Sequence, residues 1–160
     1  MKIIGSVLLA GIILVAAFLI WNSMKPAVPG NYETAVETGG EIEAKYLAQG
    51  SHDVKYTEQK VMENYKKYEV YYPADLEIEN KTYPLIVVSN GTGVKGSKAK
   101  AVFEHFASWG FVVIGNEEEY SWNGFSAEMS LKYLLRENEN KNSIFYHKID
   151  TENIGALGHS

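Results

Sequence analysis

The 160-residue sequence contains no cysteine, which excludes a disulfide framework, a cysteine-ligated zinc site and a thiol nucleophile. Positive charge is also scarce. Lys2 and Lys25 lie in the first 30 positions, which hold no acidic residue, so the rest of the chain carries 13 basic against 20 acidic residues. Such an acidic body argues against DNA or RNA as a partner, because phosphate binding needs a basic face. The apolar share of 46% excludes a disordered chain, and the length is that of one ordinary domain or a piece of a larger one.

Charge is absent altogether between Ile3 and Trp21, where the sequence reads IIGSVLLAGIILVAAFLIW. At ~1.5 Å per residue this run would extend about 28 Å, close to the ~30 Å hydrocarbon core of a bilayer. A cleaved signal peptide is the alternative, but its apolar region is usually about 7–15 residues long and ends at a small-x-small site, which is missing here. We therefore predict an uncleaved transmembrane anchor within residues 1–24. The body is then predicted to face outside the cell, joined to a single-pass helix by a tether over residues 25–50.

The remainder of the chain alternates between strand and helix patterns. The predicted strands are Asp53–Thr57, Lys66–Pro73, Leu85–Ser89, Phe111–Ile114 and Asn153–Leu157, and the predicted helices are Lys98–Trp109, ended by Gly110, and a helix capped by Ser126 that runs to Arg136. Because buried strands alternate with helices, this order predicts an α/β fold with a mainly parallel sheet and an antiparallel lead-in.

A glycine-rich segment, Asn90–Ser97, separates the strand pattern from the next helix and is named here the glycine loop. Residues 91–96 read GTGVKG, which matches G-x-G-x-x-G, and Glu117 lies 21 residues beyond Gly96. These features are typical of a dinucleotide site, so an NAD(P)-binding Rossmann-type oxidoreductase is one interpretation. Against it, Ser89 and Asn90 separate the apolar run from the first glycine.

The segment 158–160, Gly-His-Ser, follows the last predicted strand and matches the first half of a G-x-S-x-G nucleophile elbow. That elbow holds its serine on a tight strand-to-helix turn, where a side chain two places before the serine would clash. In this interpretation Ser160 is the nucleophile. The glycine loop then supplies one oxyanion-hole donor, the Thr92 amide, because a loop after an earlier strand does so in α/β-hydrolases.

Four segments occur together in an order that a known family shares: YEVYYP (68–73), YPLIVVSNGTG (83–93), FASWGFVVI (106–114) and DTENIGALGHS (150–160). On these segments the chain resembles, over roughly residues 53–160, the α/β-hydrolase superfamily near its dienelactone-hydrolase, cutinase-like and polyesterase groups. The resemblance implies a serine ester hydrolase of lipase-like kind that needs no cofactor or metal and acts on a small-molecule, lipid or polyester ester. It also implies the site residues: Ser160 as nucleophile, the Thr92 amide in the oxyanion hole, and Asn90, Gly91, Gly93 and Gly158 shaping the loops. Asn90 stands where many relatives have histidine.

The catalytic acid and histidine follow the serine in this family, whereas all four histidines here precede Ser160. We therefore expect residues 51–160 to be the N-terminal part of a membrane-anchored hydrolase domain, truncated at the nucleophile elbow, lacking its acid and base and inactive alone. A possibly separate C-terminal half would then be its partner. The alternatives left open are the Rossmann-type oxidoreductase and a catalytically inactive membrane-tethered fragment.

Overall fold

The structure, a computed structural model, describes the backbone of residues 2–159 and the side chains of residues 8–159. Its strands are β1 (Val54–Lys60), β2 (Lys67–Pro73), β3 (Tyr83–Ser89), β4 (Val112–Asn116) and β5 (Ile149–Gly158). Its α-helices are α1 (Lys2–Met24), α2 (Tyr32–Ala35), α3 (Glu41–Leu47), α4 (Lys100–Ser108) and α5 (Phe125–Glu139), joined by the 3-10 turns η1 (Ala74–Glu77) and η2 (Gly96–Ala99). All five predicted strands are therefore present, with ends that differ from the prediction by at most four residues.

The strands form one sheet in the order β1-β2-β4-β3-β5, which is mixed and not mainly parallel as predicted. β2 pairs antiparallel with both β1 and β4, whereas β3 pairs parallel with both β4 and β5. The parallel strands β3, β4 and β5 therefore end at one edge of the sheet, here named the carboxyl edge. The glycine loop leaves β3 at this edge, next to the end of β5, where Ser89 lies opposite Gly158.

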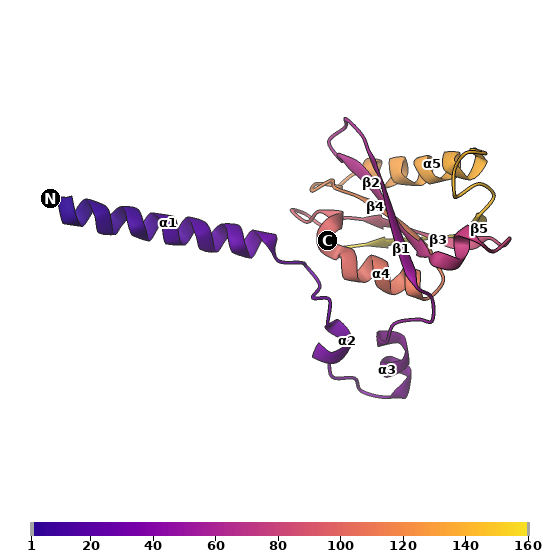
Figure 1. Cartoon of the computed structure of the whole chain (residues 1–160), viewed down its shortest axis with the longest axis horizontal. Coiled ribbons are helices and arrows are strands. Elements are labelled where there is room, and N and C mark those ends of the chain that lie inside the picture. The colour runs from indigo at the N-terminus through magenta and orange to yellow at the C-terminus, as the bar shows by residue number, and fades with distance from the viewer. Residues whose placement is uncertain (1, 160) are drawn as a thin grey trace.

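Helices α4 and α5 cover opposite faces of the sheet (Figure 1). The apolar cluster under α5 contains Tyr68, Val70, Tyr72, Leu85, Val87, Ile114 and Leu134, and the cluster under α4 contains Tyr71, Ile86, Val88, Phe103, Ala107 and Val113. Neighbouring residues of one strand alternate between these clusters, because successive side chains of a strand point to opposite faces. Phe103 is fully buried and packs over Gly115, where a Cβ atom would lie 2.5 Å from its ring.

The C-terminus of α4 confirms the prediction that Gly110 ends this helix. Gly110 has φ 97°, a left-handed conformation that suits glycine. Its N–H donates to Ala107 O, and the N–H of Phe111 donates to Phe106 O, the hydrogen-bond pair of a Schellman motif. The rings of Phe106 and Phe111 meet edge to face at 6.2 Å, which supplies the apolar contact that accompanies this motif.

The predicted N-cap of α5 is wrong, because the helix begins one residue before Ser126. Gly124 occupies the N-cap position with φ 70°, and the Asn123 side-chain oxygen accepts a hydrogen bond from the Phe125 N–H. Ser126 is instead buried in the first turn, and its carbonyl accepts a hydrogen bond from the Asn116 side chain, which fastens α5 to the end of β4.

The N-terminal part differs from the prediction as well. Among the residues whose side chains are described, no helix is long and apolar enough to cross a membrane. This finding contradicts the prediction of a transmembrane helix over residues 3–21. Residues 25–50 contain α2 and α3, and α2 contacts α4 through a hydrogen bond between the Tyr32 hydroxyl and His105 Nδ1 at 2.6 Å.

Candidate functional site

The carboxyl edge of the sheet brings together the two segments on which the predicted site depends. The N–H of His159 donates to Ser89 O at 3.3 Å, so the residue before Ser160 lies beside the start of the glycine loop. Gly91 is buried there, and a Cβ atom at this position would lie 2.3 Å from His159 Nδ1. A side chain at position 91 would therefore displace the His159 ring, which explains the glycine. Gly158 is less crowded, since the nearest described atom to a Cβ there is 3.9 Å away.

Ser160, the predicted nucleophile, lies outside the described residues. What the structure does show is the strand before it: β5 reaches Gly158 and pairs in parallel with β3 over residues 149–150 and 154–158, with a bulge between them. The predicted elbow therefore follows a hydrogen-bonded strand, which lies at the end of the strand order next to β3. That placement is the one a strand-to-helix nucleophile turn requires.

A pocket of about 290 Å³ opens at this edge. It is lined by residues of β3 and the glycine loop (Val88, Ser89, Asn90, Gly91, Val94), of the helix that follows (Ala99, Val102), of the end of β5 (Leu157, Gly158, His159), and by Ala27 and Val28. The N-terminal contribution was not predicted, since residues 25–50 carry no sequence signal beyond turn residues. Ala27 is held in place by its N–H, which donates to Lys98 O at 2.8 Å.

The Thr92 amide is free to donate at this edge. The two following amides are engaged, since the Gly93 N–H donates to Glu119 O at 2.7 Å and the Val94 N–H donates to Gly91 O at 3.0 Å. Within the described residues, no acceptor takes the Thr92 N–H. Gly93 has φ 72°, so the turn directly after Thr92 needs a residue that tolerates the left-handed region.

The Thr92 side chain faces an aromatic group that sequence reasoning missed. Trp122 Nε1 donates to Thr92 Oγ1 at 3.2 Å, and the Trp122 ring meets Tyr120 edge to face at 5.8 Å. Both rings are largely exposed. The contact joins segments 30 residues apart, so no local spacing in the sequence indicates it.

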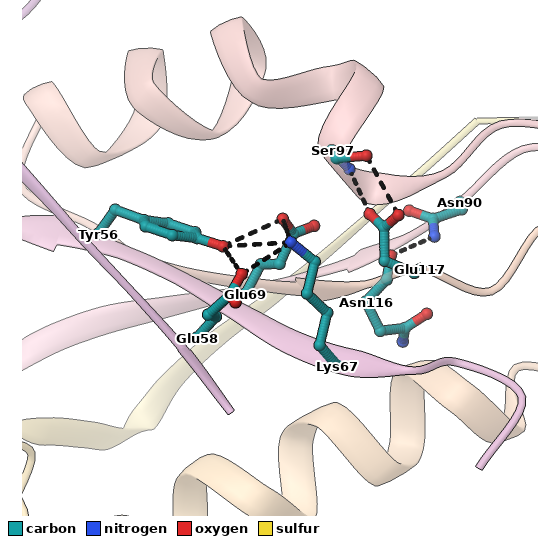
Figure 2. Close-up of polar contacts among 8 residues, drawn as sticks. All are labelled: Tyr56, Glu58, Lys67, Glu69, Asn90, Ser97, Asn116 and Glu117. Atoms are coloured by element: carbon teal, nitrogen blue, oxygen red, sulfur yellow. Dashed lines mark hydrogen bonds and ion pairs between the residues drawn. The ribbon is translucent and has the colours of Figure 1, made fainter. Parts of the chain in front are cut away.

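Asn90 holds the first residue of the glycine loop against the end of β4. Its Nδ2 donates to two backbone carbonyls, Asn116 O at 2.7 Å (Figure 2) and Glu118 O at 2.8 Å. The prediction assigned Asn90 only to loop shape. The structure adds the partners of its side chain: the two N–H groups of one amide nitrogen bond two different carbonyl oxygens. A neutral histidine has a single ring N–H and could not make both hydrogen bonds in the same way.

The dinucleotide interpretation would have the Glu117 carboxylate accept a hydrogen bond from a ribose hydroxyl, but in the structure this carboxylate is hydrogen-bonded within its own chain. The Glu117 carboxylate accepts hydrogen bonds from the Ser97 N–H at 2.8 Å and the Ser97 hydroxyl at 3.2 Å. Gly96 lies so close to β4 that a Cβ atom would be 2.4 Å from Asn116 O. The third glycine and the acidic residue of the apparent fingerprint therefore serve to fasten the glycine loop to β4.

The four histidines lie in different parts of the molecule. His52 pairs with Asp75 at 2.8 Å, His105 contacts Tyr32 on the outer side of α4, and His147 precedes β5 at the opposite edge of the sheet. Burial lowers the pKa of His105. Only His159 lies at the carboxyl edge, where its ring packs on Gly91.

The comparisons with known proteins agree with this geometry. A family model described as PETase, PET hydrolase-like, matches residues 32–160, a range that starts at α2 and so extends the predicted resemblance toward the N-terminus. No curated protein is a significant match. The family match confirms the resemblance to cutinase-like and polyesterase-type α/β-hydrolases and favours it over the Rossmann-type alternative. The chain belongs to the PET hydrolase-like family.

Proposed function

We propose that the chain carries the nucleophile and half of the oxyanion hole of a serine carboxylester hydrolase. Family membership supports the reaction class. The observation that carries the residue assignment is the free Thr92 amide, which lies in the loop beside the strand that leads into Ser160. A backbone donor at this edge that no acceptor among the described residues engages suits an anion that exists only in the transition state.

In the proposed reaction, Ser160 Oγ attacks the carbonyl carbon of an ester and the carbonyl oxygen becomes an oxyanion. The Thr92 N–H donates to that oxygen, together with the amide of the residue after the serine. A histidine takes the serine proton and returns it to the leaving alcohol; water then hydrolyses the acyl-serine by the same route. None of His52, His105 and His147 lies at the carboxyl edge, so we assign the base and its acid to residues that follow Ser160, in the chain order of this family.

The substrate proposal follows from the pocket. Its walls are mainly aliphatic, with Val88, Val94, Val102 and Leu157 facing a space of about 290 Å³. Such a space suits an apolar acyl or aryl group more than a charged one, because a buried charge without a partner is costly. Together with the family description, this favours polyesters or small neutral esters as substrates.

Hydrolysis of p-nitrophenyl butyrate by the natural full-length gene product tests the proposal. We expect the Ser160→Ala variant to lose turnover and to lose covalent labelling by a fluorophosphonate probe. Ser51→Ala is the matched control, because Ser51 is exposed and belongs to the loop before β1. Labelling that survives in Ser160→Ala would contradict the assignment of the nucleophile.

The oxyanion donor can be tested separately, because proline removes the N–H of Thr92, whereas alanine keeps the N–H and removes the side-chain hydroxyl and methyl group. Losing one oxyanion-hole donor typically lowers kcat about 10²–10³-fold. We therefore expect a loss of that size for Thr92→Pro and a small effect for Thr92→Ala, with unfolding curves recorded to show that both variants fold. Equal losses in the two variants would assign the role to the side chain instead.

A further inference from the structure

Beneath the glycine loop, on the face of the sheet that α4 covers, lies a carboxyl group that the proposed reaction does not use. Glu69 of β2 is 2% exposed. Its Oε1 atom accepts hydrogen bonds from Lys67 Nζ at 2.9 Å and from the Tyr56 hydroxyl at 3.3 Å (Figure 2). Its Oε2 atom has no partner and is the one buried side-chain oxygen or nitrogen without a partner in the described part of the chain. A buried polar atom in this state is costly and calls for an explanation.

The charges around Glu69 do not balance. Lys67 is shared, since its Nζ also contacts Glu58 Oε2 at 2.8 Å. Glu117 lies beside Glu69 on the same face of the sheet (Figure 2), because β2 pairs Glu69 with Gly115 of β4 and Glu117 follows two residues later. Three carboxyl groups therefore surround one ammonium group, and a proton on one of them would relieve the excess negative charge.

Glu69 is the carboxyl group that suits this proton. Both carboxyl oxygens of Glu117 already accept hydrogen bonds from Ser97, whereas Oε2 of Glu69 has no partner among the described residues and is free to carry the proton. The free Oε2 atom of Glu69 points toward Gly96, where a Cβ atom would lie 3.0 Å away. Burial raises the pKa of the Glu69 carboxyl, and the negative charge of Glu117 raises it further, while the hydrogen bond and charge of Lys67 act in the opposite direction.

We propose that Glu69 and Glu117 share one proton, carried on Oε2 of Glu69, and that this acid–carboxylate pair positions the glycine loop through Ser97. The proton converts Oε2 from an unpartnered acceptor into a donor toward Glu117. Glu117 in turn keeps both of its hydrogen bonds to Ser97, the last residue of the glycine loop. Glu69 is thus a positioning residue, which acts on the loop through Glu117.

The other charged or titratable groups near the pair leave this proton in place. They are Tyr56 and Glu58 of β1, Lys67 and Tyr71 of β2, and Lys95 at the start of η2. Burial alone would lower the pKa of Lys67, but its hydrogen bonds with Glu58 and Glu69 raise this pKa, so Lys67 stays charged. Burial raises the pKa of Tyr71, which stays neutral, and Lys95 pairs with Glu119 at 3.4 Å.

The stability of the closed glycine loop then depends on pH, and it decreases as the pH rises. Because the pKa of Glu69 is raised with the loop closed, the closed form binds the proton more tightly than an opened form with a hydrated carboxyl. The loop is therefore held fully below the ordinary glutamate pKa, and it loosens as the pH rises from there through the raised value. The consequence for the oxyanion donor Thr92 rests on the proposed function, whereas the proton and the loop opening do not.

Hydrogen exchange of the Ser97 amide, measured on the 160-residue chain and corrected for the intrinsic exchange rate, tests the proposal without any substrate. Between the ordinary and the raised pKa of Glu69, we expect opening to increase by up to about tenfold per pH unit and to be flat outside that window. In Glu69→Gln, a neutral group of the same shape, this pH dependence should vanish. Glu58→Gln is the matched control, because it contacts the same Lys67 but not Glu117, and it should keep the wild-type profile.

A titration of the wild-type chain followed by ¹³C NMR of its glutamate carboxyl carbons measures the proton directly in the unmodified protein. One carboxyl, assigned to Glu69 by its absence in Glu69→Gln, should titrate above the others. A Glu69 signal that titrates with the exposed glutamates would overturn the proposal. So would a pH dependence of Ser97 exchange that persists unchanged in Glu69→Gln. Absence of esterase activity would leave both measurements unaffected and would count against the proposed function alone.

Discussion

Replacement of Asn90 by alanine tests directly how the glycine loop is held to the sheet. The change removes two hydrogen bonds, to the carbonyls of Asn116 and Glu118. Each contributes about 1 kcal/mol net, so their loss alone costs about 2 kcal/mol. Asn116 is buried, so its carbonyl loses a partner where water does not easily reach, while Glu118 is only half-buried. We therefore expect a loss of about 2–3 kcal/mol in the free energy of unfolding.

Aspartate at the same position separates hydrogen bonding from shape. Asn90→Asp keeps the size of the side chain but places a carboxylate oxygen where the amide nitrogen now lies, 2.7–2.8 Å from two carbonyl oxygens. At neutral pH it should therefore be less stable than Asn90→Ala, because two attractive contacts become repulsive. Protonation restores one donor, so the deficit should shrink as the pH falls.

Urea unfolding at pH 7, followed by circular dichroism, measures these differences. With a slope of roughly 2 kcal/mol per molar urea, Asn90→Ala should lower the midpoint by about 1–1.5 M. Asn80→Ala is the control, because Asn80 is exposed before β3, and such surface changes usually stay within about 0.5 kcal/mol. An Asn90→Ala midpoint equal to that of Asn80→Ala would refute the inference that these two hydrogen bonds fasten the loop.

Three further predictions concern packing and activity. Gly96→Ala should cost about 1–3 kcal/mol by urea unfolding, because its Cβ would lie 2.4 Å from the carbonyl oxygen of Asn116, and a neutral result would mean that η2 shifts freely. Phe103→Ala should cost about 3–5 kcal/mol, because the ring is fully buried and meets Tyr71 edge to face at 5.4 Å; a loss below 1 kcal/mol would contradict its place in the core. Residues 1–160 alone should not hydrolyse p-nitrophenyl butyrate above a Ser160→Ala background, because the one histidine at the carboxyl edge, His159, is the sequence neighbour of Ser160, and neighbouring side chains of an extended segment diverge; robust Ser160-dependent turnover would identify a base within this segment.

Much of the fold could be predicted because the strands carry local signals. The apolar runs at 85–89 and 111–114 and the alternation at 66–73 each mark a strand, and Gly110 marks a helix end by a steric rule that needs only one residue. The N-cap of α5 was misplaced by two residues because Ser126 fits an N-cap by residue type, while Gly124 takes that position through its backbone conformation. The antiparallel lead-in and the parallel pairing of β3 with β4 and β5 agree with the prediction, whereas the even balance of two parallel and two antiparallel pairs does not, since it depends on chain topology and not on side-chain pattern.

The candidate site was only partly predictable, for a related reason. The glycine loop and segment 158–160 were identified from their glycines, because a close approach or a positive φ restricts the residue type at the position itself. The partners of Asn90 and of Thr92 lie 26–30 residues away, and nothing in their own residue types marks them. Glu117 was noticed, but spacing alone could not distinguish a ligand-binding carboxylate from one that binds its own chain.

The contacts of the glycine loop share one feature that explains its shape. Asn90, Gly93 and Ser97, at the beginning, middle and end of the loop, all donate to residues 116–119, which form the end of β4 and the segment directly after it. The loop is thus positioned by the segment at the end of the neighbouring strand, which the parallel pairing of β3 and β4 places alongside it. The amides of Gly93 and Ser97 and the side chain of Asn90 are engaged by these acceptors, whereas the Thr92 N–H has no acceptor among the described residues. A loop fastened at three points can keep one donor unpaired, because the ties elsewhere prevent it from turning inward to find an acceptor.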